Sequence, residues 1–345
     1  MSNRTIKDQN RAFKNILIIG HSNIGDTCYD LVVIDPLRRR FPQAKISFLT
    51  SSRVDNIVRG YKGLDKVFTF DKHGKDRGVI GRLRLIIVLI KKRLDLVIVL
   101  NSTLMHKFLG IPCVWSVRGY LDCKPSENKI HIVDTYLEFL QFHGIDAQKE
   151  IFSFALGEKE NNFVDAFLAR EGISSKDRLI GILPIAAWSL KSWPIDKWNE
   201  LAAILKSQYG IKIINLSKSS NDSFSQMVLK NISSEIISAD KTTLRQAMAL
   251  IKRCNLFIGP DSSLLHLASC MGIETIGLYG ATPASRFYPY FHHHNVIASK
   301  EKFDCMPCYP GFKLFPCKGK SWFSACMEGI SVEDVLELVK QKLDL

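Results

Sequence analysis

Apolar runs of four to six residues alternate with longer amphipathic segments through the first half of the chain. The short runs predict strands at residues 16–19, 45–49, 66–70, 95–100 and 112–117, and the longer segments predict helices at residues 25–40, 79–93 and 131–143. A continuous apolar run is typical of a strand that is buried on both faces, and strands that alternate with helices indicate a parallel sheet. Pro36 should kink or shorten the first helix, because proline lacks the backbone N–H that a helix interior needs.

The same alternation restarts after a polar, charged stretch at residues 157–177. It predicts strands at residues 179–183, 211–216, 256–258 and 275–279, and helices at residues 162–171, 195–208, 222–231 and 242–252. We therefore predict an α/β protein with two similar units, 1–165 and 166–330, whose boundary falls between about Ala155 and Arg178. A last amphipathic segment within residues 331–345 is able to cross back onto the first unit.

A chain of 345 residues is too long for one compact α/β unit and suits two. No apolar run approaches the roughly 18–20 residues of a membrane span, and the polar residues 1–14 do not resemble an export signal, so we expect a cytoplasmic globular protein. The 47 Lys and Arg residues against 34 Asp and Glu residues give a net charge of +13, which favours anionic partners. Nucleic acid is disfavoured as a partner, because no recognised nucleic-acid module accompanies this charge.

Part of the positive charge is concentrated in one stretch of the first half, around an apolar centre at residues 85–90. The cations of this stretch are Lys72, Lys75, Arg77, Arg82, Arg84, Lys91, Lys92 and Arg93. Three interpretations stay open: a helix that lies on an anionic membrane surface, a groove wall for a phosphorylated acceptor, and a buried crossover helix with solvated basic ends.

The most informative turn is the sequence Gly-Pro-Asp-Ser-Ser-Leu-Leu-His at residues 259–266, between two apolar runs. It predicts a strand, a tight turn and a short helix whose first N–H groups lack partners within the helix. These groups and the positive end of the helix dipole favour an anion, and Ser262 and Ser263 add donors. The turn therefore predicts a phosphate site, with an ordinary capped helix as the alternative.

A matching turn follows the first strand of the chain. Asp26 lies beyond the carboxyl end of that strand, where open α/β sheets bind ligands, and Ser22, Asn23 and Gly25 share its loop. A purely structural Asp26, which stabilises the helix dipole, is the alternative. Gly20 and Gly25 alone do not make a dinucleotide-binding fingerprint, because the middle glycine is absent.

The loop at residues 184–194 is the third candidate for ligand binding. It follows a predicted buried strand and places the cation Lys191 between Trp188 and Trp193. A lysine is a point charge that suits a diphosphate. A surface lysine in a tryptophan-rich loop is the alternative.

Taken in order, these motifs resemble the glycosyltransferases of family 9, the heptosyltransferases, and more closely their heptosyltransferase II branch. The resemblance rests on residues 16–26, 37–44, 191–194, 261–268, 277–283 and 326–327. It implies a GT-B architecture, with two Rossmann-like parallel-sheet domains facing a cleft, the acceptor on residues 1–165 and the nucleotide sugar on residues 166–330. It also implies an inverting transfer from ADP-heptose to a lipopolysaccharide core or a similar anionic glycolipid, with peripheral contact to the inner face of the bacterial inner membrane. The alternatives are another nucleotide sugar with a protein or polysaccharide acceptor, and a non-catalytic nucleotide-binding module.

The resemblance also assigns roles to individual positions. Asp26 matches the general base and Lys191 the donor-phosphate lysine of the family. The resemblance does not identify the residue that holds the donor's ribose, for which Asp222 is a candidate. The diphosphate turn of the family matches Asp261, Ser262, Ser263, Leu264 and His266, although Ser263 stands where the family usually has glycine. No cofactor is required for catalysis, because a lysine and helix N–H groups are able to stabilise the charge on the departing diphosphate.

Four of the nine cysteines are close together in the sequence. They form a CxxC pair followed by two further thiols, at Cys305, Cys308, Cys317 and Cys326. This spacing suits one tetrahedral zinc or iron ion, with reduced or paired thiols as the alternative.

Overall fold

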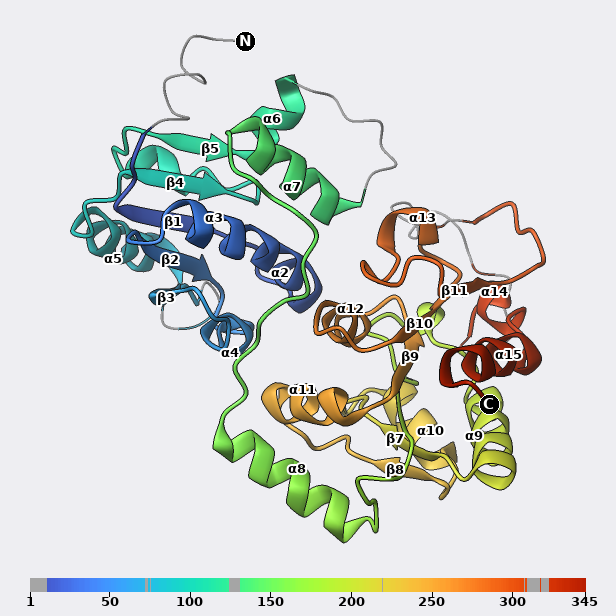
Figure 1. The fold of residues 1–345 in the computed structure, drawn as a ribbon. Helices are drawn as coiled ribbons and strands as arrows, with labels where there is room; N and C mark the ends of the chain where they lie inside the picture. Colours follow the sequence, from blue (N-terminus) through green and yellow to red (C-terminus); the bar gives the residue numbers. More distant parts are fainter. Residues whose placement is uncertain are drawn as a thin grey trace. The chain divides into compact units, whose positions relative to one another are not determined.

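The computed structural model describes residues 11–71, 74, 76–123, 131–218, 220–306, 308, 317 and 323–345. The chain divides into two units, Met1–Ala155 and Leu156–Leu345. Each unit contains a parallel sheet wrapped by helices, so the predicted α/β class with two Rossmann-like units is confirmed (Figure 1). Helix α8 (Glu158–Arg170) belongs to the second unit, and the division therefore falls before this helix rather than inside it at residue 165.

The sheet of the first unit has the strand order β3-β2-β1-β4-β5, and all of its pairs are parallel. Its strands are β1 (Asn15–Ile19), β2 (Lys45–Thr50), β3 (Lys66–Thr69), β4 (Leu96–Val99) and β5 (Val114–Ser116). The helices of this unit are α2 (Ile24–Asp30), α3 (Ile34–Arg40), α4 (Asp55–Arg59), α5 (Gly78–Ile90), α6 (Val117–Cys123) and α7 (Ile132–Phe142), with 3₁₀ turns η1 (Leu31–Val33) and η2 (Met105–Phe108).

Helices cover both faces of this first sheet. On one face, Leu85 and Leu89 of α5 join a buried cluster with Leu17 and Val97 of the central strands. Helices α2, α3 and α7 lie together on the other face (Figure 1). The helix expected at residues 25–40 is interrupted by η1, which leaves Pro36 in the first turn of α3, where proline is tolerated.

The sheet of the second unit has the order β8-β7-β6-β9-β10-β11, again with parallel pairs throughout. Its strands are β6 (Leu179–Ile182), β7 (Lys212–Asn215), β8 (Ile236–Ser238), β9 (Leu256–Pro260), β10 (Thr275–Tyr279) and β11 (Val296–Ala298), of which β8 and β11 are too short for the apolar pattern to predict. Besides α8, the helices are α9 (Ile195–Tyr209), α10 (Ser223–Asn231), α11 (Leu244–Arg253), α12 (Ser263–Cys270), α13 (Ala284–Phe287), α14 (Ala325–Glu328) and α15 (Val332–Leu343), with the 3₁₀ turn η3 (Ser189–Lys191).

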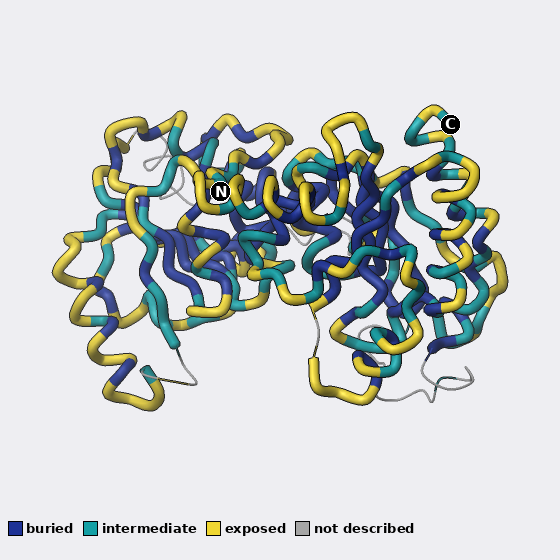
Figure 2. Tube along the Cα trace, turned by 90° about the horizontal axis from the view of Figure 1, so that it is seen from below, coloured by how far each residue is buried: buried dark blue, intermediate teal, exposed yellow. Residues whose placement is uncertain are grey.

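The last helix is part of the second unit. Val335 and Val339 of α15 are fully buried in one core cluster with Leu201 and Leu205 of α9. This packing within the second unit accounts for the amphipathic pattern of the segment, and the crossing back to the first unit stays a prediction. In both units the strands are buried while exposed positions gather on helices and loops (Figure 2). None of the described helices combines the length and apolar content that crossing a membrane requires.

Each sheet reverses its strand order once, where β1 lies beside β4 in the first unit and β6 beside β9 in the second. Ligands of open parallel sheets bind beyond the carboxyl ends of the strands at this reversal. The strands there lead into Gly20 and Asn101 in the first unit, and into the loop at residues 183–194 and Asp261 in the second. The fold therefore places the residues singled out from the sequence at the two reversal points.

Candidate functional site

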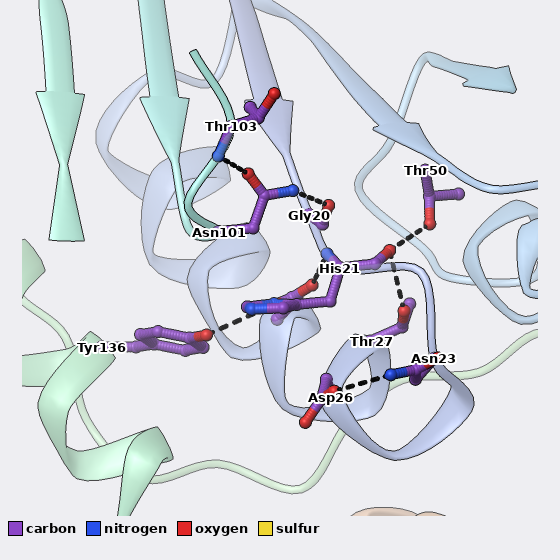
Figure 3. A network of polar contacts seen from close by, with 10 residues as sticks. Gly20, His21, Asn23, Asp26, Thr27, Thr50, Asn101, Thr103 and Tyr136 are labelled. Carbon is purple, nitrogen blue, oxygen red and sulfur yellow. Dashed lines mark hydrogen bonds and ion pairs between the residues drawn. The ribbon is translucent and has the colours of Figure 1, made fainter. Parts of the chain in front are cut away.

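The first reversal point is built on Gly20, directly after β1. A Cβ atom at this position would lie 2.3 Å from the ring of Phe48 and 2.7 Å from the carboxylate of Asp30, so only glycine fits without a shift of the neighbours. The carbonyl of Gly20 accepts a 2.6 Å hydrogen bond from the Asn101 amide, whose oxygen accepts from the backbone N–H of Thr103 (Figure 3). The loops after β1 and β4 are thereby tied together.

A buried carboxylate holds the next residue of the loop, His21. Asp30 is fully buried at the end of α2 and accepts hydrogen bonds from the backbone N–H of His21 at 2.5 Å, from its Nδ1 at 2.9 Å and from the Tyr136 hydroxyl at 3.2 Å. Burial lowers the pKa of His21, but the hydrogen bond and charge of Asp30, with the charge of Asp26, outweigh it and raise the pKa above its usual 6.5. The pair fixes the loop that carries Asp26.

Asp26 itself is exposed in the first turn of α2. Its carboxylate receives a long contact of 3.4 Å from the side-chain amide of Asn23 (Figure 3). The carbonyl of Ser22 accepts from the Ser51 hydroxyl at 3.0 Å, and Gly25 forms part of the same helical turn. Asp26 is therefore a solvent-accessible carboxylate on a rigidly held loop, as a proton acceptor for an arriving hydroxyl must be.

A cavity of about 400 Å³ opens beside this loop in the first unit. Its polar lining comes from the carboxyl ends of the strands and includes Ser22, Thr50, Ser51, Asn101 and Thr103. The remaining lining includes one cation, Arg82, and apolar side chains from α5 and η2. A lining that combines hydroxyls and amides with apolar side chains suits a sugar that is attached to something apolar.

The second reversal point holds a cluster of three charged or polar side chains, which we call the Asp261 cluster. One oxygen of Asp261 lies 3.1 Å from Lys191 Nζ and the other lies 2.8 Å from His266 Nε2. Burial raises the pKa of Asp261, but His266 and Lys191 outweigh it and hold the pKa below its usual range. Sequence-distant Lys191 and Asp261 are thus brought together as the resemblance implied.

Beside this cluster lies the amino end of α12, where the first N–H groups of a helix have no partner within the helix. Ser262 is the N-cap residue, yet its hydroxyl makes no capping bond and is buried without a hydrogen-bond partner among the described residues. Ser263 and Leu264 form the first helical turn and are half-buried. A buried hydroxyl with no partner, next to the free N–H groups of an eight-residue helix, is suited to an anion.

The loop that carries Lys191 is held by buried polar groups that the sequence pattern did not single out. The Ser192 hydroxyl accepts from the backbone N–H of Ala186 at 2.9 Å, and the Ser217 hydroxyl accepts from that of Ile185 at 2.9 Å. Asn215, fully buried at the end of β7, accepts from the backbone N–H of Ser217, and its side-chain nitrogen has no partner within the described chain. In the sequence, the feature that could have pointed to Asn215 is that a polar residue ends an apolar run.

Trp193 corrects the expectation of two aromatic rings at this loop. It is fully buried, packs edge-on against Trp198 at 5.0 Å between ring centroids, and donates its indole N–H to the carbonyl of Ile330. Trp193 therefore anchors the loop to the core, whereas Trp188 is half-buried. The prediction was wrong for Trp193 because a single sequence does not show which side of a loop faces the core.

Asp222 is the N-cap residue of α10. Hydrogen bonds from the hydroxyls of Ser220 and Ser225 and from the backbone N–H of Ser225 lower its pKa to about 2. No hydrogen bond or ion pair in the described part of the structure joins Asp222 to the Asp261 cluster. The ribose-binding role of Asp222 therefore stays a prediction, next to a capping role that the geometry explains.

The four clustered cysteines are all among the described residues. Burial, followed by the charges of Cys305 and Cys326, a hydrogen bond with Cys305 and the charge of Cys317, raises the pKa of Cys308 to about 11. The thiols therefore lie in one neighbourhood. Within the described ranges, however, no three His, Cys, Asp or Glu side chains are arranged to hold a metal ion.

The family model "Glycosyltransferase family 9 (heptosyltransferase)" matches residues 121–317. The lipopolysaccharide core heptosyltransferase OpsX of Haemophilus influenzae is 24% identical over 309 residues, covering 84% of this chain and 85% of its own.

Two solved structures show the fold of these relatives. A family 9 glycosyltransferase from Veillonella parvula superimposes with a TM-score of 0.82 at 20% identity, covering 97% of this chain and 98% of its own. The ADP-heptose lipopolysaccharide heptosyltransferase II of Escherichia coli superimposes with a TM-score of 0.68 at 22% identity, covering 95% and 98%. At these identities the likeness establishes the fold, and the matched family model confirms the resemblance read from the motifs.

Proposed function

The chain belongs to glycosyltransferase family 9, the heptosyltransferases, and on that premise we propose that it transfers a heptose from ADP-heptose to a lipopolysaccharide core or a similar anionic glycolipid. The names of the relatives support this donor and this class of acceptor. The proposal places the reaction, with inversion at the anomeric carbon, at the cytoplasmic face of a bacterial inner membrane.

The donor half of the proposal rests on one observation: the Asp261 cluster lies beside the buried Ser262 hydroxyl, which has no hydrogen-bond partner in the described part of the chain. Lys191, the Ser262 hydroxyl and the N–H groups at the start of α12 offer positive charge and hydrogen bonds to a diphosphate. These groups stabilise the negative charge that grows on the diphosphate as the bond to the sugar breaks. Asp261 holds the Lys191 ammonium in place, and His266 holds Asp261.

The acceptor half rests on Asp26 and the cavity of the first unit. We assign Asp26 as the general base that takes the proton of the acceptor hydroxyl. A carboxylate is a weak base for an alcohol, so the proton moves late, when bonding to an oxocarbenium-like anomeric carbon has made the hydroxyl acidic. The polar wall of the cavity binds hydroxyls of the acceptor sugar, and Arg82 binds an anionic group on it.

The donor is tested with thermal unfolding of the full chain in the presence of single nucleotide sugars, because a ligand that binds only the native state raises its melting temperature. We expect a shift with ADP-heptose and none with UDP-sugars, followed by ADP release when acceptor glycolipid is added. A shift with a UDP-sugar alone overturns the donor. A shift without release of nucleotide on any acceptor supports the rival proposal of a non-catalytic nucleotide-binding module.

For the four cysteines we propose a structural zinc or iron ion that takes no part in the transfer. Its support is the shared neighbourhood of the thiols and their spacing in the sequence, not the described side-chain arrangement. Metal analysis of protein purified without chelators tests it. An equimolar ion that survives dialysis supports the site, and metal-free protein that keeps full stability rejects it.

A further inference from the structure

Helix α5 is apolar on the face that points to solvent. Gly81, Leu85 and Leu89 form its buried side. The exposed fractions of the outward side chains are nevertheless 76% for Ile80, 52% for Leu83 and 53% for Ile87, with Val79 and Ile90 also more than half exposed. The outward face of an ordinary crossover helix is polar, so this face is unusual and marks an interaction surface.

The apolar surface continues onto the turn that borders the cavity of the first unit. Leu104 and Phe108 of the segment around η2 are 58% and 67% exposed. Both line the cavity together with Ile86, which lies on α5 beside the outward stripe. The outward face of α5 and these two side chains therefore form one surface at the edge of the cavity, which we call the α5 surface.

The α5 surface carries positive charge only. Between residues 77 and 93 the chain has no Asp or Glu and six exposed cations: Arg77, Arg82, Arg84, Lys91, Lys92 and Arg93. Within the described part of the chain, none of the six forms an ion pair. The nearby Lys72 and Lys75 lie outside the described residues.

We propose that the α5 surface docks on an anionic lipid bilayer, with its apolar side chains at the boundary of headgroups and acyl chains and its cations on lipid phosphates. An exposed apolar stripe with basic flanks is the pattern of helices that lie in a membrane interface, and each added cation strengthens attraction to anionic lipid. A second copy of this chain does not fit, because two such surfaces repel each other. The core of a typical protein interface is depleted of charge, whereas unpaired cations of one sign surround this stripe.

Docking in this way deepens the proposed function and rests on it for one point, the identity of the acceptor. The surface borders the cavity, so the bilayer would meet the protein at the opening where the acceptor enters. A sugar anchored in the membrane by acyl chains then reaches the polar wall of the cavity without leaving the bilayer. Arg82 is part of both the cavity and the α5 surface, because it lines the cavity and is one of the six exposed cations.

Co-sedimentation of the full chain with vesicles tests the docking. We expect binding to phosphatidylcholine vesicles that contain phosphatidylglycerol, weak binding to pure phosphatidylcholine, and a decrease in binding with added salt. The variant Ile80→Gln/Leu83→Gln/Ile87→Gln should bind at least ~10-fold more weakly, because three apolar side chains no longer enter the bilayer. Glutamine is a good helix former, and thermal unfolding checks that the variant is folded.

The matched control is Ile151→Gln, which replaces a side chain of the same unit that is 57% exposed, and it should bind as the unmodified chain does.

Equal binding by the triple variant, or no binding to anionic vesicles, overturns the proposal. A dimer of the unmodified chain that the triple variant loses overturns it in favour of self-association. Vesicle binding needs no donor, so binding without transfer overturns the proposed function alone. Transfer to a water-soluble acceptor without vesicle binding overturns the docking alone.

Discussion

Both reversal points contain a histidine–aspartate pair, but the pair has a different role in each unit. Each holds a histidine against a buried aspartate, with His21 2.9 Å from Asp30 in the first unit and His266 2.8 Å from Asp261 in the second. In the first unit the buried acid comes from the far end of α2 and only supports the loop. In the second unit the buried acid belongs to the turn itself, directly after β9, and it also holds Lys191.

This difference decides the charge that each unit offers a ligand. The first unit satisfies its buried acid internally and leaves a second carboxylate, Asp26, exposed. The second unit uses its acid to hold a cation and leaves the Ser262 hydroxyl without a partner among the residues that the structure describes. One sheet therefore presents a group that accepts protons, and the other presents groups that stabilise an anion, which are the two halves that a transfer with a diphosphate leaving group needs.

The largest expected effect comes from removing the exposed acid. In Asp26→Asn the side chain keeps its size and loses its basicity. We expect kcat to fall by about 10²- to 10⁴-fold, the usual contribution of a general base. The affinity for donor should not change, because Asp26 belongs to the acceptor half. Initial rates of ADP release and donor titration calorimetry measure the two quantities.

The control for this change is Asp146→Asn, which removes another exposed carboxylate of the first unit and should leave kcat as it is. Unchanged turnover of Asp26→Asn removes Asp26 from the mechanism and leaves it as a helix-dipole residue.

The second-largest expected effect is a loss of donor affinity in the second unit. Lys191→Ala removes the cation that Asp261 holds, and a hydrogen bond to a charged group contributes about 1.5–3 kcal/mol. We therefore expect the donor Kd to rise by roughly 10- to 100-fold. Calorimetry with ADP-heptose measures it, and Lys241→Ala, an exposed lysine of the same unit, serves as the control. An unaltered donor affinity would mean that the diphosphate binds elsewhere.

A third change tests the packing that supports the first turn. In Gly20→Ala the new methyl group meets the Phe48 ring and the Asp30 carboxylate, and overpacking of this kind lowers the free energy of unfolding by about 1–3 kcal/mol. Urea denaturation measures the loss. The control is Gly119→Ala in α6, where the nearest atom lies 3.8 Å away and alanine favours the helix, so stability should stay level or rise slightly. Equal effects of the two changes would show that the close contacts with Phe48 and Asp30 are not the reason why position 20 requires glycine.

The sequence pattern predicted the described strands except β8 and β11, because continuous apolar runs are local signals and these two strands are too short to give one. It also placed Lys191 and Asp261 at one site, through the family resemblance. It missed the Asp30–His21 pair, since the third partner, Tyr136, is distant along the chain and only the fold brings it near. Periodicity alone left open whether the apolar residues of α5 are buried or lie on a surface, because apolar side chains occur on both faces of this helix and the pattern does not tell which face meets the sheet.

The smallest expected effect is a difference between the two histidine–aspartate pairs in how their contribution to the free energy of unfolding depends on pH. The pKa of His21 is raised above 6.5, so the stability that its bond to Asp30 adds is fully present below pH 6.5 and is lost as the pH rises through the raised value. His21→Gln should therefore lower the free energy of unfolding by about 1–2 kcal/mol at about pH 5.5 and by less at about pH 9. The pKa of Asp261 is lowered from 3.8, so its contribution is present above pH 3.8 and is lost only as the pH falls below that value. The loss that comes from titration of Asp261 itself therefore lies outside the range between those two pH values. Urea denaturation of His21→Gln and of the unmodified chain at each pH measures the difference, and a constant deficit for His21→Gln would show that Asp30 holds the loop without charging the histidine.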